Sequence, residues 1–308
     1  MSQKPYHSEQ LDEIRQKIDA LDTRIHDTLV ERAELVLKIG EEKRKNNIEV
    51  VQPAREARMI RRLLSKHKGA LPEMAVVRIW RELVGAVSLL QTGLKVVVAE
   101  NQDRPEYWDL AKDYFGSCLP MSRASSSISA LNAVRDGRAT FAVVPYPHDG
   151  PDDEEDKPWW EFLDVGMESA MNISVRLPHG DDPHNKNPDY LALVVARTGF
   201  DASGDDHSFI YIETDPTLSR GKIVSMLEEH GMKAVSISSK RVTDDTPRRK
   251  HLVEIIGYWQ NEMPEIEKLT DSFDEKTILS CVGGYPVPAI YTKTILPQSK
   301  PIPSAPLE

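Results

Sequence analysis

Apolar residues recur every three or four positions near the start of the chain. They are Leu11, Ile14, Ile18, Leu21, Ile25, Leu35 and Ile39. This spacing puts them on one face of a long helix, which we expect to run from Ser8, a suitable N-cap, to about Lys45. The seven-residue step that leads to Ile25 next reaches Arg32, so a guanidinium interrupts the apolar face.

Two shorter helices are predicted after the long one. Proline suits the first turn of a helix, and Pro53 therefore opens a helix that reaches about Lys66. A third helix runs from Pro72 to about Thr92, where apolar residues again have helical spacing. Residues 8–94 are thus predicted to be an all-helical domain of three helices.

The pattern changes at Leu94, where strands begin. A buried strand is indicated by LKVVVAE, and helix, turn and strand by SSISALNAVRDGRATFAVVPY. Residues 95–200 are therefore predicted to form an α/β segment with parallel strand pairing. Within it, 148–158 and 177–189 are expected to be polar loops, and 191–196 a further strand.

Residues 205–290 alternate strand and helix patterns in the order β-α-β-β-α-β. This order is typical of the ferredoxin-like arrangement of α+β domains. Residues 291–308 are rich in proline, and we expect a disordered tail. The predicted fold class is therefore multidomain: an all-α three-helix domain, an α/β segment and a ferredoxin-like domain.

Composition excludes several classes of function. The 308 residues carry a net charge of −10, which disfavours nucleic-acid and anionic-membrane partners. No apolar run approaches the ~18 residues of a membrane span, and the start MSQKPYHSEQ lacks the apolar region of a secretory signal. Cys118 and Cys281 are too few for a disulfide framework or a zinc site. We expect a soluble cytoplasmic protein in which any anion site is a local concentration of positive charge.

Other chemical motifs are weak. His179 and His184 lie five residues apart in a polar loop, and a metal site or cofactor is not expected from them. Trp159 and Trp160 follow the acidic loop and are expected to anchor packing.

Arg32 has two readings that remain open at this point. Its guanidinium could reach out of the helical face or pair with a buried acid. Alternatively an anionic ligand pairs with it, because an unpaired charge in an apolar face is costly. Lys43, eleven residues on, lies about 20° around the helix and so on the same face. Arg15 lies about 260° around, and could reach this groove from a second copy of the chain.

Three more polar residues could join this groove. Arg55 and Glu56 lie in the first turn of the second helix, and Gln91 lies near the end of the third. Each also has a simpler reading, as a surface charge or a helix-end residue. Together with Arg32 and Lys43 they would form a cationic groove with one carboxylate and one amide.

Three stretches resemble the all-helical chorismate mutase family. They are LDEIRQKIDALDTRIHDTLVERAELVLKIGEEK, VVQPAREARMI and IWRELVGAVSLLQ, and the resemblance covers residues 8–94. It implies an interlocked homodimer with shared active sites, chorismate as the substrate, and no cofactor or metal. The reaction is the intramolecular rearrangement of chorismate to prephenate in aromatic amino-acid biosynthesis.

The resemblance also implies catalytic roles. Arg32 is similar to the arginine that grips a substrate carboxylate, and Glu56 to the glutamate that accepts a bond from the ring hydroxyl. Lys43 and Gln91 resemble the donors to the ether oxygen. Such a set would hold the chair-like conformer and stabilise charge on the breaking ether bond.

Four residues are implied in substrate binding. Arg15 resembles the arginine that crosses from the other protomer, and Arg55 the neighbour of the catalytic glutamate. Gln52 stands where the family has an aspartate, and Val87 where it has a serine. These two departures predict retuned binding rather than loss.

Residues 95–200 resemble part of a prephenate dehydratase. YWDLAKDYFG and SISALNAVRDGRATFAVVPY are similar to its first lobe. The family's catalytic Thr-Arg-Phe is replaced by Asp189-Tyr190-Leu191, and too few residues separate Tyr146 from Asn187 for a second lobe. We therefore expect a degenerate segment without dehydratase activity.

Residues 205–290 resemble an ACT domain by element order. Its phenylalanine-binding motifs are replaced by DPTL at 215–218 and SSKR at 238–241. An effector site and a purely dimerising or stabilising role both stay open. For the whole chain, two alternatives to a mutase remain: a bifunctional mutase–dehydratase, and a non-catalytic sensor of chorismate or an aromatic amino acid.

Overall fold

A computed structural model describes residues 9–46, 51–99, 106–147, 150–151, 158–181, 190–240 and 248–291. The three predicted helices are confirmed as α1 (Glu9–Lys45), α2 (Pro53–Lys66) and α3 (Glu73–Thr92). The chain divides into two compact units, one of residues 1–50 with 87–93 and one of 51–86 with 94–308. The predicted cap Ser8 lies outside the described residues.

The apolar face of α1 is largely exposed. The exposed fraction lies between 39% and 57% for each residue of this stripe, which consists of Leu11, Ile14, Ile18, Leu21, Ile25, Leu35 and Ile39. Gly40 is the buried position of this helix. An amphipathic helix is normally stabilised by packing of its apolar face, and here that face is open to solvent in the single chain.

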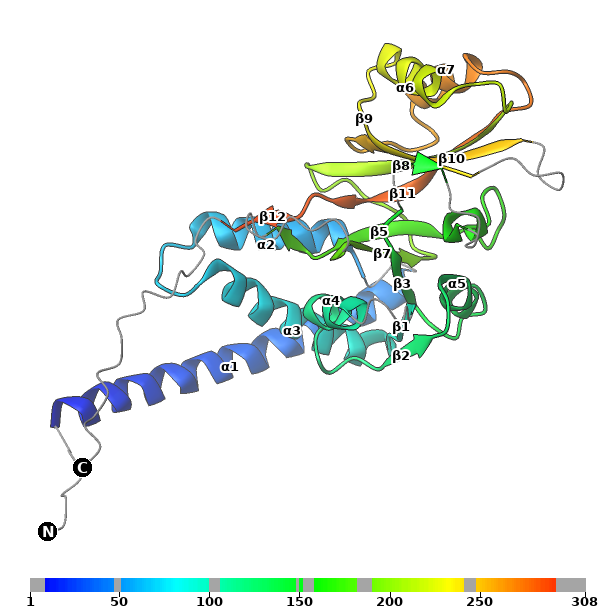
Figure 1. The fold of residues 1–308 in the computed structure, drawn as a ribbon. Helices are drawn as coiled ribbons and strands as arrows, with labels where there is room; N and C mark the ends of the chain where they lie inside the picture. Colours follow the sequence, from blue (N-terminus) through cyan, green and yellow to red (C-terminus); the bar gives the residue numbers. More distant parts are fainter. Residues whose placement is uncertain are drawn as a thin grey trace, which may run out of the picture. The chain divides into compact units, whose positions relative to one another are not determined.

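The second unit is built on a ten-stranded mixed sheet of order β2-β1-β3-β7-β5-β11-β8-β10-β9-β4 (Figure 1). Its strands are β1 (Val96–Ala99), β2 (Met121–Ala124), β3 (Phe141–Pro145), β4 (Gly150–Pro151), β5 (Asn172–Leu177), β7 (Ala192–Ala196), β8 (Asp206–Thr214), β9 (Ala234–Ser239), β10 (Arg249–Ile256) and β11 (Ile278–Pro286). A separate parallel pair joins β6 (Gly180–Asp181) to β12 (Ala289–Ile290).

The α/β part has the predicted parallel pairing. β1 pairs in parallel with both β2 and β3. Helices α4 (Glu106–Phe115) and α5 (Ser127–Arg135) cover its two faces, so β3 is buried on both sides (Figure 1). Phe141 packs against Phe115 of α4 at 5.2 Å between ring centroids, whereas Ala142 and Val144 join the core with α5. This explains the continuous apolar run of the strand.

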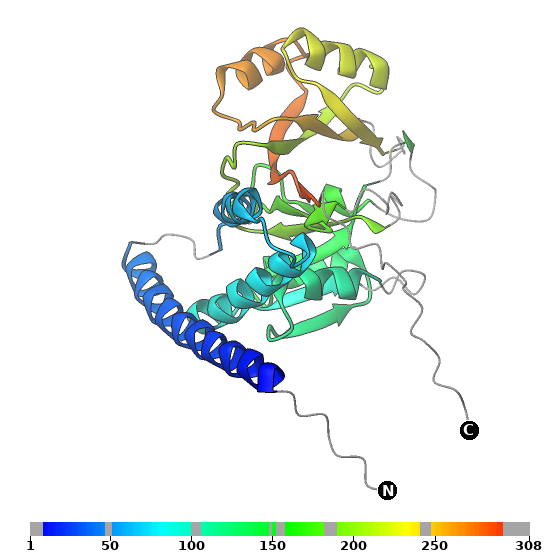
Figure 2. The same ribbon diagram turned by 90° about the vertical axis from the view of Figure 1, so that its left-hand side faces the viewer.

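The ferredoxin-like part has the predicted element order. β8, α6 (Arg220–Glu229), β9, β10, α7 (Pro264–Asp271) and β11 follow one another, and the strands pair antiparallel. Both helices cover one face (Figure 2), where Ile210, Ile212 and Val253 pack against them. The alternate residues Phe209 and Tyr211 point to the other face. There they join the core that contains Trp159 and Trp160 of η1 (Trp159–Phe162). The predicted role of these two tryptophans in packing is thus confirmed.

The α/β and ferredoxin-like parts share one sheet and one core. β5 pairs with β7 and, in parallel, with β11, where Gly283 lies opposite Ile173. β5 was not predicted as a strand. Its six residues, NISVRL, alternate polar and apolar, so the strand pattern was present in the sequence.

Two predicted boundaries differ from the structure. The compact units do not divide at residue 94, because α2 and most of α3 belong to the second unit. Arg61 of α2 donates to the carbonyls of Asp205 and Val287 in that unit. The predicted tail begins with a buried residue, since Tyr291 packs with Ile60 and Val77. The remainder of that tail, 292–308, lies outside the described residues.

Candidate functional site

The first unit carries three of the predicted catalytic residues. Arg32 and Lys43 of α1 are both half-buried. Burial lowers the pKa of Arg32 below its usual value, yet a guanidinium remains charged at neutral pH. The rise of the helix separates the two backbone positions by about 16 Å along one face.

Gln91 lies across α1 between these two cations. Its Nε2 donates to the backbone carbonyl of Val36 at 2.5 Å. A Cβ atom on Gly40 would approach Cγ of Gln91 to 2.8 Å and Nε2 to 2.9 Å. A glycine at position 40 therefore leaves the space in which the Gln91 side chain contacts the backbone of α1. Val36 is about 40° around the helix from Arg32, so the amide shares the face of the two cations.

The four residues assigned to substrate binding are divided between the two units, with Arg15 and Val87 in the first and Gln52 and Arg55 in the second. Arg15 is exposed and pairs with Asp12 of its own helix at 3.3 Å. Arg55 is exposed, and Gln52 precedes α2 without capping it through its side chain. Val87 is buried in α3.

Glu56 lies in the second unit and has a buried arginine as its partner. Nη1 of Arg81, in α3, donates to Oε2 of Glu56 at 2.6 Å. The Arg81 side chain is 6% exposed and that of Glu56 is 13% exposed. Tyr114 of α4 completes the cluster: its hydroxyl lies 3.4 Å from Glu56, and the guanidinium stands 4.1 Å from the centre of its ring. Burial alone would lower the pKa of Arg81, but Tyr114 and Glu56 raise it overall.

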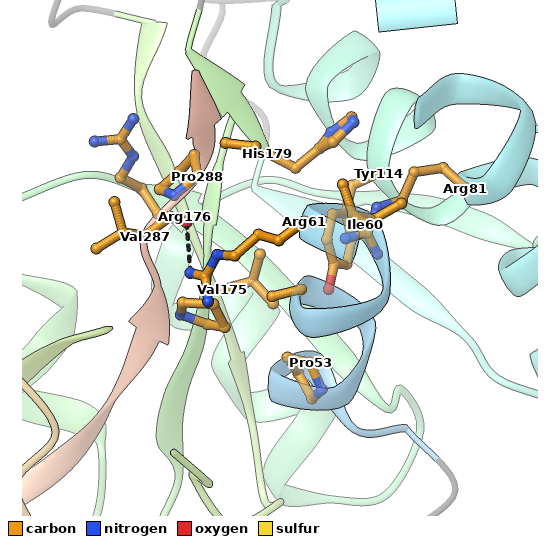
Figure 3. Close-up of a pocket in the computed structure, with 13 residues that line it drawn as sticks. Pro53, Ile60, Arg61, Arg81, Tyr114, Val175, Arg176, His179, Val287 and Pro288 are labelled. Carbon is orange, nitrogen blue, oxygen red and sulfur yellow. Dashed lines mark hydrogen bonds between the residues drawn. The ribbon is translucent and has the colours of Figure 1, made fainter. Parts of the chain in front are cut away.

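A cleft opens beside this cluster (Figure 3). Arg81, Tyr114 and His179 lie together on one side of it, and Ile60 and Val175 contribute apolar surface. The ring of His179 stands 5.9 Å from that of Tyr114. Burial, reinforced by the charges of Arg81 and Arg78, lowers the pKa of His179 to about 3. The imidazole is therefore neutral at neutral pH.

Sequence reasoning did not select Arg81 or Tyr114. Arg81 follows Trp80 within an apolar helix and looks like ordinary helical charge. One usable signal was that Val77 and Val84, four residues before Arg81 and three after it, place Arg81 on an apolar face of the helix. His179 was noted only as one member of a weak histidine pair, and its companion His184 lies outside the described residues.

A second buried cluster surrounds Glu254 of β10. His207 contacts Oε1 through Nδ1 at 2.6 Å, and the hydroxyls of Tyr146 and Tyr285 donate to the same carboxylate. Burial would raise the pKa of Glu254, but these hydrogen bonds lower it overall. The cluster joins β10 to β8, to β11 and to the end of β3, so it ties the ferredoxin-like part to the α/β part.

The described part of the chain contains neither a candidate metal site nor a helix that could span a membrane. No group of three histidine, cysteine, aspartate or glutamate side chains there could hold a metal ion. The described helices include none with the length and apolar character needed to cross a bilayer.

Comparison with known proteins gives one family match and one curated relative. A family model for type II chorismate mutase matches residues 14–92. The bifunctional chorismate mutase/prephenate dehydratase of Aquifex aeolicus is 32% identical over 141 residues, which are 44% of this chain and 39% of that protein. The chain thus spans well under half the length of this relative.

Solved structures of prephenate dehydratases overlap more loosely. The Arthrobacter aurescens enzyme, in complex with L-Phe, has a TM-score of 0.44 and 12% identity, covering 63% of this chain and 90% of that one. The Streptococcus mutans enzyme has a TM-score of 0.42 and 14% identity, covering 64% and 99%. Overlap at this level does not establish a common fold. The similarity to type II chorismate mutases thus rests on the sequence match over the helical segment, residues 14–92.

Proposed function

We propose that this protein is a chorismate mutase, an isomerase of aromatic amino-acid biosynthesis. The observation that carries the proposal is the arrangement on α1, where Arg32, Lys43 and the amide of Gln91 share one face. The family match over residues 14–92 supports the same activity.

In the proposed mechanism these residues bind and orient a dicarboxylate. Arg32 binds one carboxylate through paired N–H groups. Lys43 and Gln91 donate to the ether oxygen, where negative charge grows as the bond breaks. Glu56 accepts a bond from the ring hydroxyl, with Arg55 beside it, and Gln52 and Val87 adjust the fit. The reaction is intramolecular, so holding the reactive conformer supplies much of the rate.

The site is proposed to be shared between two chains. The apolar stripe of α1 supports a homodimer, because a patch of this length is unusual on the surface of a monomer. Arg15 of the partner subunit would then complete the groove around chorismate. Interlocking long helices would bury the stripe and build two equivalent sites.

The remaining parts are proposed to be non-catalytic. Residues 95–200 are a degenerate dehydratase-like segment, and residues 205–290 an ACT-like domain that stabilises the chain or binds an effector. The sheet they share supports a joint structural role. We place the protein in the cytoplasm.

A second candidate is a bifunctional mutase–dehydratase, because the relative from Aquifex aeolicus carries that name. The replacement of the family's Thr-Arg-Phe argues against it. Of the replacing residues Asp189-Tyr190-Leu191, Tyr190 is 38% exposed and Leu191 directly precedes β7.

A product assay on the purified full chain separates these functions. Chorismate is added, and prephenate and phenylpyruvate are resolved under conditions where prephenate survives. Prephenate alone is the expected result. Phenylpyruvate would support the bifunctional candidate, and bound chorismate without turnover would contradict both enzymatic proposals.

A further inference from the structure

The carboxylate of Glu56 is held by two side chains from other helices. Nη1 of Arg81, in α3, donates to Oε2 at 2.6 Å, and the hydroxyl of Tyr114, in α4, donates to the same oxygen at 3.4 Å. α4 follows β1 and so belongs to residues 95–200, the α/β segment. A glutamate assigned to the mutase site therefore has part of its support outside the helical domain.

The orientation of Arg81 is fixed from two sides. Its guanidinium stands 4.1 Å from the centre of the Tyr114 ring, and both residues are only 5% exposed. The ring in turn packs edge-on against Phe115, with 4.9 Å between the ring centroids. A planar guanidinium is attracted to an aromatic face and donates in fixed directions. The ring of α4 thus sets the direction in which Arg81 donates to Glu56.

The two contacts divide the Glu56 carboxylate into two ends. Both fall on Oε2, and the side chain is 13% exposed. A carboxylate can accept hydrogen bonds at each of its oxygens. Oε1 is therefore the oxygen that we assign to the ring hydroxyl of chorismate, and the hold on Oε2 determines where Oε1 points.

The helix that carries Glu56 is also anchored to the ferredoxin-like part. Arg61 of α2 donates to the carbonyl of Asp205 at 2.8 Å and to that of Val287 at 2.9 Å (Figure 3). Arg58, one turn before it, donates to the carbonyl of Ala202. The backbone of α2 is thus held by residues that precede β8 and follow β11, while Arg81 and Tyr114 hold its Glu56 side chain.

We propose that Arg81 and Tyr114 are positioning residues of the mutase, which act on the reaction through Glu56. The inference rests on the proposed mutase function and gives the α/β segment a share in that site. A catalytic side chain works best when packing and hydrogen bonds already hold it in its productive geometry. Without this hold Glu56 has to be ordered each time that substrate binds, so the rate falls.

The test is a double-mutant cycle on kcat/KM for chorismate, measured with the full chain. Tyr114→Phe keeps the ring over Arg81 and should lower kcat/KM about threefold, since it removes one long hydrogen bond. Arg81→Lys keeps the charge but loses the planar fork, and should lower it about tenfold. In a Glu56→Gln protein both further changes should fall below about twofold, because the carboxylate that they position is gone. A merely structural role would lower the rate equally in both backgrounds.

Tyr211→Phe is the matched control. Tyr211 is also 5% exposed, and its hydroxyl donates to the carboxylate of Glu213 at 3.1 Å. This variant should leave kcat/KM unchanged at a similar cost in stability. Urea unfolding of the wild type, Tyr114→Phe, Glu56→Gln and the double variant measures the same coupling without turnover, and we expect non-additive changes there too.

The outcomes separate this inference from the proposed function. An active wild type with unaffected Tyr114→Phe and Arg81→Lys proteins, or equal losses in the Glu56→Gln background, would overturn the positioning role alone. Additive changes in unfolding would overturn the contact between Tyr114 and Glu56. A wild type that does not turn over chorismate would overturn the proposed function, and the positioning role with it.

Discussion

The side-chain amide of Gln91 donates to the backbone carbonyl of Val36 at 2.5 Å, over a turn of α1 that Gly40 keeps clear of side-chain atoms. The amide is thereby held on the face that carries Arg32 and Lys43. In the proposed reaction it must turn from Val36 to the ether oxygen of chorismate, so substrate replaces an internal hydrogen bond rather than filling an empty donor site.

Substitution of Gly40 should affect activity more than stability. Alanine in a helix is favoured over glycine by about 1 kcal/mol, but its Cβ would displace the Gln91 side chain. We expect Gly40→Ala to lower the kcat for chorismate about tenfold or more, with little change in Tm. Gly69→Ala, in an exposed turn, is the control and should alter neither value. An unchanged kcat for Gly40→Ala would show that the position of the amide does not matter.

Removal of either cation of the α1 face should abolish most of the activity. Arg32→Ala and Lys43→Ala are each expected to lower kcat/KM by about 10²–10³, the typical cost of one transition-state donor. Lys38→Ala removes an exposed cation about 240° around the helix from Arg32, and should keep near-normal activity. Near-normal rates for the first two variants would rule out this groove as the active site.

The apolar stripe of α1 should control assembly. Glutamate at both Ile18 and Ile25 would place charge in the proposed interface, where burial without a partner is costly. We expect this double variant to sediment as a monomer and to lose mutase activity, because Arg15 of the partner subunit is withdrawn. Lys17→Glu changes charge beside the stripe and should remain dimeric. A dimeric, active double variant would contradict the shared site.

The Arg81–Glu56 pair should dominate stability near α3. Arg81→Met leaves the Glu56 carboxylate buried without its cation, and loss of one member of a buried pair costs roughly 3–5 kcal/mol. Arg78 pairs with Asp113 at the surface, so Arg78→Met should cost under about 1 kcal/mol. Urea unfolding of both variants measures the difference. Equal destabilisation would mean that Glu56 finds another partner.

Stability should fall in mild acid because of buried histidines. Burial, with the charges of Arg249 and Arg220, lowers the pKa of His251 to about 4. The unfolded chain therefore takes up a proton between about pH 6.5 and pH 4 that the folded chain does not bind. Each such histidine should reduce the free energy of unfolding by up to about 1.4 kcal/mol per pH unit over this window. His179 acts in the same direction.

A histidine substitution tests this origin of the acid sensitivity. His251→Gln should flatten the dependence of the unfolding free energy on pH between 6.5 and 4, although its stability at pH 7 is lower because Ser239 loses its partner. His26→Gln, at an exposed position, should leave the slope unchanged. An unchanged slope for His251→Gln would place the titration elsewhere.

The local pattern of residues was sufficient to predict most of the elements and the face of α1 that carries Arg32 and Lys43. The three helices and the β-α-β-β-α-β order follow from periodicity and from turn residues, which act over a few neighbouring positions. The shared face of Arg32 and Lys43 follows from helical geometry alone. β5 was not predicted although NISVRL alternates like a strand, and its pairing with β11 joins residues more than a hundred positions apart, which local pattern cannot show.

The sequence by itself determined most of the elements, the resemblance of residues 14–92 to chorismate mutases and the shared face of Arg32 and Lys43, because each depends on near neighbours along the chain. Only the tertiary structure decided that Arg81 is buried against Glu56, that His179 faces the same cleft, and that the α/β and ferredoxin-like parts share one sheet. Those features depend on desolvation and on long-range pairing. The order of residues places Arg81 in an apolar helix but does not identify its partner, since an arginine there reads the same whether it faces water or a buried carboxylate.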